Sequence, residues 1–326
     1  MTAHLGLTVP LAGESLGELA GIVEAATSSG FTDIWSAEGT GPDAFTPLVA
    51  AATLHPGLRY GTAIAGAFIR SPALLTMQAA GLADLVSSHP TGETLVGIGS
   101  SSDIMVGQWH GIPFQRPWHR VRDVVRFLRA AMSGDKVDLH TDSFDITGFR
   151  LQTVPARPPL LLVAALRRRM LELGGTEADG VILNWLSAGD VAAVKHHVLD
   201  SNPDAEIAAR LFAIVADDQE QARIAARRQI AAYLNVPVYA DFHRWLGRGP
   251  ALEPMWTAWA AGDRRGALAA IPDAVVDELF LLGTPAQIRA GIDEYVAAGV
   301  TSPMLAVTVL SGDRNDVIRS LGPGAA

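Results

Sequence analysis

The chain has 326 residues, 49% of them hydrophobic, with a formal net charge of −9 at pH 7 and no cysteine. This length supports a large core, in one big α/β domain or two ordinary ones. The acidic balance argues against a nucleic-acid partner, and the missing thiols exclude disulfides, thiolate metal sites and cysteine nucleophiles. The chain shows no signal-peptide pattern and no apolar run of the ~18 residues that span a membrane. We therefore expect a soluble cytoplasmic protein without a membrane partner.

The first third of the chain alternates short apolar runs with helical patterns. Apolar runs of this kind are typical of buried parallel strands. A helix is predicted to start at Ser71, because a proline follows in its first turn. The strands are predicted at residues 5–9, 31–37, 60–64 and 96–99, and the helices at 16–26, 45–54 and 71–86.

The rest of the chain continues this alternation with two departures. An amphipathic helix is predicted at 118–132, and a small β-excursion at 144–153 precedes the fifth strand. An irregular segment at 237–272 holds three tryptophans, which we expect to be core residues of an insertion rather than walls of a pocket. These tryptophans are Trp245, Trp256 and Trp259. Further strands are predicted at 160–164, 180–183, 207–215 and 304–309, with helices after 218 and at 284–298.

Eight buried strands that alternate with helices favour a (β/α)8 TIM-type barrel over an open doubly wound sheet. Such a barrel needs about 250 residues, so the surplus indicates insertions after strands four and seven. No linker rich in Pro, Gly or Ser divides the sequence. We therefore expect residues 1–326 to form a single domain of the α/β class.

The functional residues of such a barrel lie on the loops that follow its strands. The fourth strand ends in Gly97, Gly99 and three serines, a combination that permits close approach to the backbone and offers small polar groups. The other strand ends carry few strong acids or bases. The sequence shows no metal-ligand spacing, no P-loop and no nucleophile elbow. A site of this composition is typical of an enzyme whose cofactor supplies the chemistry.

Several stretches, in order along most of the chain, carry a family resemblance. They are residues 38–48 (EGTGPDAFTPL), 61–64 (GTAI), 97–102 (GIGSSS), 109–114 (WHGIPF), 178–186 (ADGVILNWL) and 283–285 (GTP). Together they resemble the bacterial luciferase-like monooxygenase superfamily, and in particular its branch of deazaflavin (F420)-dependent oxidoreductases. The resemblance implies a TIM-type barrel that holds a flavin or deazaflavin ring at the ends of its strands.

The resemblance also assigns residues to the cofactor ring. In this family strand three commonly ends in a bulge with a non-prolyl cis peptide behind the ring, and the matching bond here joins Ala63 and Ile64. The ends of strands two and four would line the ring as well. The residues assigned to the ring are therefore Ser36, Ala63, Ile64, Gly99, Ser100 and Ser101.

The phosphate end of the cofactor is assigned to the start of the helix after strand five. The backbone of Ala164, Ala165 and Leu166 would hold it there. Many relatives continue with Gly-Pro, whereas this chain continues with Arg167 and Arg168. Cations at a helix N-terminus oppose the helix dipole, and a bound anion would remove that conflict. We expect both arginines to bind the anionic tail of F420; the alternative is a solvated basic face paired with a nearby carboxylate.

Two titratable residues are candidates for catalysis. Glu38, after strand two, is either an acid–base group or a cap for the next helix and its loop amides. His110 either donates a proton or orients substrate near the reacting carbon, or it caps and packs its own loop. Ser102 stands where the sugar-phosphate dehydrogenase branch of the family has a carboxylate. A substrate of the glucose-6-phosphate type is therefore not expected.

The first hypothesis is an F420-dependent oxidoreductase that transfers a hydride between C5 of the deazaflavin and a small organic substrate. The alternative cofactor is FMN, in a luciferase-type monooxygenase that uses oxygen and a separate reductase. A third hypothesis is a barrel that has lost catalysis and serves as a binding protein. The resemblance also suggests a homodimer, and neither a metal nor a nucleic acid is expected to take part.

Overall fold

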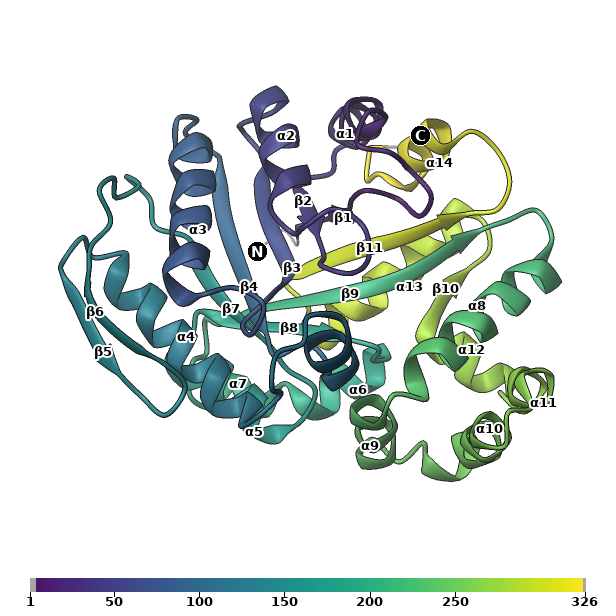
Figure 1. The fold of residues 1–326 in the computed structure, drawn as a ribbon. Helices are drawn as coiled ribbons and strands as arrows, with labels where there is room; N and C mark the ends of the chain where they lie inside the picture. The colour runs from purple at the N-terminus through teal and green to yellow at the C-terminus, as the bar shows by residue number, and fades with distance from the viewer. Residues whose placement is uncertain (1–3, 325–326) are drawn as a thin grey trace.

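The fold is built around a closed barrel of eight parallel strands (Figure 1). The computed structural model describes residues 4–324. Each strand pairs with the next, and the β11–β1 and β8–β9 ladders close the ring. This arrangement confirms the barrel expected from the sequence. The strands are, in order around the ring, β1 (Gly6–Thr8), β2 (Asp33–Ser36), β3 (Arg59–Gly66), β4 (Glu93–Gly99), β7 (Leu160–Ala164), β8 (Gly180–Asn184), β9 (Glu206–Val215) and β11 (Ser302–Val309).

Helices connect the strands and cover the outside of the barrel (Figure 1). Their starts follow local signals in the sequence. The Ser71 side chain accepts a hydrogen bond from the Leu74 amide at the start of α3, and Thr284 forms a capping box with Gln287 at the start of α13. The covering helices are α1 (Leu19–Ser28), α2 (Thr46–Leu54), α3 (Pro72–Ser87), α4 (Pro117–Ala131), α5 (Arg168–Glu177), α6 (Ala188–Val194), α7 (His196–Leu199), α13 (Pro285–Ala298) and α14 (Arg314–Leu321).

The insertion after β4 holds the π-helix η1 (Ile104–Trp109) and, beyond α4, an antiparallel hairpin of β5 (Val137–His140) and β6 (Asp145–Phe149). The β-excursion predicted at 144–153 is therefore wrong in extent, because the hairpin begins at Val137, which pairs with Phe149. Its first strand has only two apolar residues among its four. So short a run gives little alternation to detect.

The insertion after β9 is mostly helical over the segment predicted to be irregular, with short turns between its helices, so that prediction is wrong. Pro237 and Pro250 lie in the first turns of their helices, where proline begins a helix instead of breaking it. The helices are α8 (Gln219–Leu234), α9 (Pro237–Trp245), α10 (Gly249–Ala260), α11 (Arg264–Ala269) and α12 (Asp273–Leu279), followed by the short strand β10 (Phe280–Leu282) on β9.

The tryptophans of this insertion differ in burial. Trp256 is buried, and its indole nitrogen donates a hydrogen bond of 2.8 Å to the Leu234 carbonyl. Trp259 is partly buried against the same apolar cluster. Trp245 is 42% exposed. The expectation of core residues is therefore confirmed for Trp256 and wrong for Trp245.

Apolar side chains close the middle of the barrel. Trp35 is fully buried there, and a Cβ atom added to Gly61 would lie 2.2 Å from its ring, so only glycine leaves the room that the indole needs. This layer separates the amino end of the barrel from the carboxyl end, and any ligand must enter from one of them. Its members are Trp35, Leu95, Leu162, Ile182, Ala208 and Met304.

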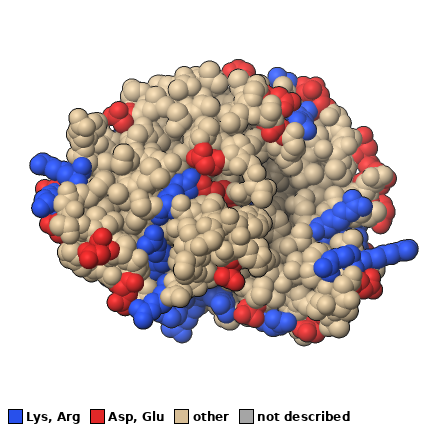
Figure 2. All heavy atoms as spheres, viewed as in Figure 1, with Lys and Arg blue, Asp and Glu red and all other residues tan. Residues whose placement is uncertain are grey.

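Charged side chains are scattered over the surface. Figure 2 shows small groups of both signs, most of them near the rim of the molecule, and large neutral areas between them. No helix of the described part, residues 4–324, combines the length and the hydropathy needed to cross a membrane.

Candidate functional site

The carboxyl end of the barrel, which we call the mouth, brings the predicted cofactor residues together. These residues end or follow four strands that are neighbours in the sheet, β2, β3, β4 and β7. Parallel strands deliver the residues that follow them to one edge. Ser36 ends β2, Ala63 and Ile64 lie in β3, Gly99 ends β4 before Ser100 and Ser101, Ala164 ends β7 before Ala165 and Leu166, and Arg167 and Arg168 begin α5.

The end of β3 is irregular, as the resemblance implied. The peptide bond between Ala63 and Ile64 is cis. The register of β3 against β4 shifts between Thr62 and Ala65, which marks a bulge at the same place. Both residues of the cis bond are partly exposed toward the mouth.

Gly99 completes a wall of small apolar groups beside this bulge. A Cβ atom at position 99 would lie 2.9 Å from Cδ1 of Ile64 and 3.0 Å from Cβ of Ala164. Contacts this short force the neighbours to move, so glycine is what lets the ends of β3, β4 and β7 meet closely. We call Ile64, Gly99 and Ala164 the mouth wall.

Glu38 fastens the bulge to the end of β2. Its backbone amide donates to the Ile64 carbonyl (3.3 Å), and its carboxylate accepts from the amides of Gly66 (3.0 Å) and Ala44 (3.3 Å). Arg70 forms an ion pair with the same carboxylate, which is only 9% exposed. Glu38 therefore binds loop amides, as one of its two sequence interpretations held, and its acid–base role stays a prediction.

Sequence reasoning missed a second support of the β3 loop. Arg120 of α4 donates to the carbonyl oxygens of Ala67 (2.9 Å) and Ser143 (2.9 Å), and its guanidinium lies over the rings of Phe68 and Phe144. Burial lowers the pKa of Arg120. The signal was available, since an arginine on the helix face next to buried valines has to find acceptors.

His110 follows η1 on the segment that leaves β4. Its backbone amide donates to the Met105 carbonyl (3.2 Å), and the residue is exposed. Within residues 4–324 its ring makes no hydrogen bond or ion pair. The catalytic role of His110 stays a prediction.

The start of α5 presents its arginines to solvent. Arg168 pairs with Glu172 one turn later (2.7 Å), and this hydrogen bond raises the pKa of Arg168. The guanidinium of Arg169 lies over the ring of Trp118, 4.7 Å from its centroid. Arg167 is the exposed N-cap residue. Within residues 4–324, the side chains of Arg168 and Arg169 thus contact neighbouring side chains, whereas that of Arg167 makes no ion pair or hydrogen bond.

Among residues 4–324, several buried polar atoms without partners lie at or beside the carboxyl ends of the strands, whereas others, such as Nε1 of Trp35 and both ring nitrogens of His243, lie elsewhere. Burial without a hydrogen bond is costly, and native structures contain few such atoms. Within residues 4–324 these atoms find no partner, so ordered water or a ligand has to satisfy them. Those at or beside the carboxyl ends are Oγ1 of Thr8, Oγ of Ser36, Oδ1 of Asn184, Nε1 of Trp185 and Nε of Arg210.

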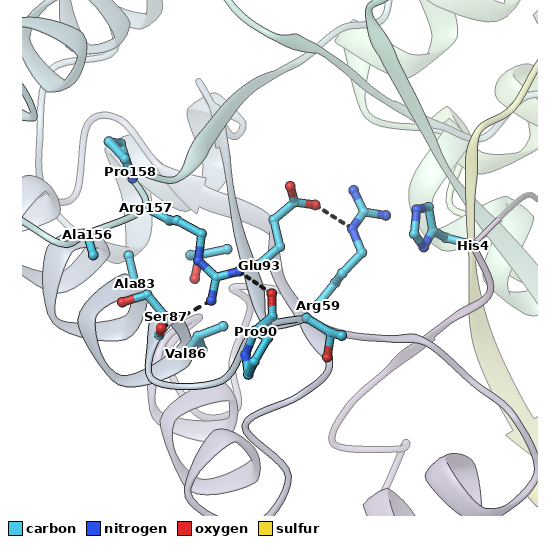
Figure 3. A pocket seen from close by; sticks show the side chains of 13 residues that line it. His4, Arg59, Ala83, Val86, Ser87, Pro90, Glu93, Ala156, Arg157 and Pro158 are labelled. Carbon is cyan, nitrogen blue, oxygen red and sulfur yellow. Dashed lines mark hydrogen bonds and ion pairs between the residues drawn. The ribbon is translucent and has the colours of Figure 1, made fainter. Parts of the chain in front are cut away.

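The amino end of the barrel has a separate cleft of about 610 Å³ (Figure 3). Arg59 pairs there with Glu93 (2.7 Å), Asp33 (3.0 Å) and Glu206 (3.2 Å). Although burial opposes it, these carboxylates leave the pKa of Arg59 raised. Arg157 donates to backbone oxygens of the loop after α3 (Figure 3). Because both guanidinium groups already bind groups of the chain, we interpret the arginines of this cleft as structural. The mouth is therefore the better candidate site.

Metal ligands do not gather at either end. Within the part of the chain that the structure describes, no group of three or more His, Cys, Asp or Glu side chains is placed to hold a metal ion.

Comparison with known proteins identifies the family. The family model of luciferase-like monooxygenases matches residues 2–302. The chain belongs to this family. A Mycobacterium tuberculosis protein, named as a candidate coenzyme F420-dependent oxidoreductase, is 25% identical over 322 residues, which cover 90% of this chain and 91% of that protein. The 5,10-methylenetetrahydromethanopterin reductase of Archaeoglobus fulgidus is 26% identical over 317 residues, with 94% and 93% covered.

A solved structure supports the fold. The coenzyme F420-dependent tetrahydromethanopterin reductase of Methanopyrus kandleri superposes with a TM-score of 0.80 at 18% identity, over 100% of this chain and 99% of that one. The luciferase-like barrel expected from the sequence is thus confirmed.

Proposed function

We propose that this protein is an F420-dependent oxidoreductase that transfers a hydride between C5 of the deazaflavin and a small organic substrate. The M. tuberculosis relative is named for coenzyme F420, and the M. kandleri enzyme depends on it. The observation that carries the proposal is the mouth wall, a surface of apolar groups, together with the buried hydroxyl of Ser36, which ends the neighbouring strand β2 and has no partner within residues 4–324.

The residues of the mouth fit a flat, polar-edged ring. Ile64, Gly99 and Ala164 offer an apolar surface against which one face of the ring packs. The ring edge carries hydrogen-bonding groups, and the buried Ser36 hydroxyl has no partner within residues 4–324. We assign Ala63, Ser100 and Ser101 to the rim of the same surface.

The tail of the cofactor is assigned to the start of α5. The backbone of Ala164, Ala165 and Leu166 leads there, and the first amides of a helix favour a phosphate. Arg167 and Arg168 lie on the exposed side of this end, where they attract an anionic tail.

When bound, the deazaflavin supplies the carbon that gives or accepts the hydride. The mouth wall excludes water and the β3 bulge orients the ring. A side chain near the reacting carbon donates or accepts a proton. The Glu38 carboxylate is already engaged by two amides and Arg70, so we assign it to positioning the bulge. The His110 ring has no partner within residues 4–324, and we assign the proton to it.

Titration with F420 and with FMN tests the cofactor. Tight binding of F420 and weak binding of FMN are expected, and each is followed by the change in its absorbance and fluorescence. The reverse order would replace the proposal with a luciferase-type FMN monooxygenase. Failure of both to bind would replace it with a barrel that acts as a binding protein.

A matched pair of glycine variants tests the mouth wall. Gly99→Ala adds a Cβ atom that meets Ile64 and Ala164 at 2.9 and 3.0 Å, whereas Gly81→Ala adds the same atom where no other segment of residues 4–324 lies within 4 Å. We expect Gly99→Ala to weaken F420 binding about tenfold, by shifting the wall, which corresponds to ~1.4 kcal/mol. Gly81→Ala should bind F420 as the parent does. Equal affinities in all three proteins would show that the ring lies elsewhere.

A further inference from the structure

Arg210 faces the mouth from the strand opposite the mouth wall. In β9 it stands two residues after Ala208, which belongs to the apolar layer inside the barrel, so both side chains point inward. Its register partners are Asn184, the last residue of β8, and Met304 of β11. In the ring of eight strands β9 is four places from β3. Arg210 therefore lies across the mouth from the Ala63–Ile64 bulge.

The guanidinium of Arg210 has no partner within residues 4–324. It takes part in no ion pair or hydrogen bond there, and its Nε atom is buried. Burial lowers the pKa of Arg210, yet arginine keeps its charge in proteins. The residue is partly exposed, so its charge is partly withdrawn from water without a partner, which is destabilising. The other deeply placed arginines have partners: Arg59 with three carboxylates, Arg70 with Glu38, Arg120 with three carbonyls, and Arg248 with Asp190 and Glu278.

Aromatic residues surround Arg210 and leave few acceptors for it. The Phe212 ring lies 5.4 Å from its Cζ atom. Trp185 packs on Phe212 (4.1 Å between centroids) and on Tyr233 (5.1 Å). Burial raises the pKa of Tyr239, so its hydroxyl stays neutral. Within the described residues, Nε1 of Trp185 and Oδ1 of Asn184 are also without partners, so this side of the mouth offers polar groups that a ligand can bind.

We propose that Arg210 binds an anionic group of the substrate, a carboxylate or a phosphate, and holds the substrate against the β9 side of the mouth. A guanidinium binds both groups through paired charged hydrogen bonds. The indole N–H of Trp185 supplies a further donor. The inference rests on the proposed function in that the remaining substrate then extends toward the ring on the mouth wall. The aromatic cluster favours a substrate whose anion is attached to a planar or apolar body.

Binding of simple probes tests the proposal without knowledge of the substrate. The probes are benzoate, phenyl phosphate and neutral benzamide, titrated by calorimetry into the full-length protein with and without F420. The variants are Arg210→Met, which keeps a long side chain and removes the charge, and Arg210→Lys, which keeps the charge and loses the paired hydrogen bonds of the guanidinium. Arg228→Met is the control, because Arg228 is an exposed residue of α8 and its loss changes net charge equally.

We expect one of the two anions to bind the parent and the Arg228→Met protein, with benzamide at least tenfold weaker. Arg210→Met should weaken the binding of that anion about tenfold or more, since it loses charged hydrogen bonds. The affinity of Arg210→Lys should lie between those of the parent and Arg210→Met. Preference for benzoate or for phenyl phosphate separates a carboxylate substrate from a phosphate. Equal affinity for benzamide, or no loss in Arg210→Met, overturns the proposal, as does failure of both anions to bind.

Two further measurements separate this proposal from the proposed function. F420 affinity is measured on the same samples, and Arg210→Met should leave it unchanged. A loss of F420 affinity in place of anion affinity assigns Arg210 to the cofactor and overturns the proposal. If F420 fails to bind while an anion binds through Arg210, the cofactor assignment fails and the anion site stands. The melting temperature of Arg210→Met should be the same as that of the parent or higher, because a partly buried charge without a partner is removed, and this shows that the variant is folded.

Discussion

The two ends of the barrel each hold an inward arginine, in opposite electrostatic states. At the amino end Arg59 has three carboxylates within 3.2 Å. At the mouth Arg210 has none within residues 4–324, and its neighbours are aromatic. Arg59 thus helps to hold β2, β3, β4 and β9 together, whereas Arg210 destabilises the folded state. A buried charge alone does not mark a functional site; the missing partner does.

Methionine at each position should produce effects of opposite sign, and this is the largest expected difference. Arg59→Met leaves the Asp33 carboxylate, which is 0% exposed, without its cation. Breaking a buried ion pair in this way costs about 3–5 kcal/mol of unfolding free energy. Arg210→Met should unfold at the same or a higher urea concentration than the parent. Urea titrations of the three proteins measure this, and equal destabilisation by both variants would contradict the contrast between the two ends.

Glu38 combines the two roles. It forms an ion pair, as Arg59 does, and it also holds the β3 bulge of the proposed cofactor site. Glu38→Ala removes the acceptor of the Gly66 amide and the partner of Arg70. We expect a loss of about 2–3 kcal/mol in stability and weaker F420 binding, measured by urea titration and by F420 fluorescence.

Glu38→Gln is the matched variant, because the amide oxygen still accepts from Gly66 but has no charge and no useful acid–base chemistry. If Glu38 positions the bulge, Glu38→Gln keeps most of the F420 affinity and part of the turnover. An acid–base role predicts instead that F420 binds normally to Glu38→Gln while turnover falls as far as in Glu38→Ala.

The eight strands and most covering helices were predictable, because the sequence of a parallel barrel alternates apolar runs, which form the strands, with amphipathic runs, which form the helices. The ends of β2, β3, β4 and β7 followed from the same alternation. The cis bond at Ala63–Ile64 had no signal of its own in composition or spacing. It was predictable only through the family resemblance.

What escaped prediction depends on contacts between distant residues. The position of Arg120 beside buried valines indicated that it needs acceptors, but Ala67 and Ser143 lie on separate segments, so no local pattern shows which acceptors it finds. Arg210 was hidden for a different reason: one charge in the apolar run 207–215 did not disturb the strand prediction. A charged residue inside a buried strand is itself a signal, since it requires either a partner or a ligand.

His243 sharpens the comparison of the two arginines. It is buried, and neither ring nitrogen has a partner within residues 4–324, yet it lies in the insertion. Burial lowers its pKa to about 3, with Arg248 acting in the same direction and Asp190 opposing. A histidine escapes the cost of charge by losing its proton, which an arginine cannot do. A histidine without a partner therefore avoids the cost of charge without a ligand, although the neutral ring of His243 still has no hydrogen bond within residues 4–324.

The consequence is a pH dependence of stability. The unfolded chain binds a proton at His243 below pH ~6.5 and the folded chain does not, so stability is full above that pH and falls as pH drops toward 3. The loss is up to about 1.4 kcal/mol per pH unit, and it is best read between pH 6.5 and 5, where surface carboxylates remain ionised. His243→Leu should flatten this slope in urea titrations. An unchanged slope would mean that His243 is protonated in the folded state.

The smallest expected effect concerns the exposed arginines of α5, which differ from Arg59 and Arg210 in being screened by water. Arg167→Ala combined with Arg168→Ala should weaken F420 binding by no more than several-fold, since water screens the attraction between exposed cations and an anion. Glu172→Gln should strengthen binding slightly, because it releases Arg168 from its 2.7 Å pair. Both effects should fade in 1 M salt, where the screening length is about 3 Å. If fluorescence titrations show no change in either direction, the arginines are a solvated basic face and the tail of the cofactor binds through backbone amides alone.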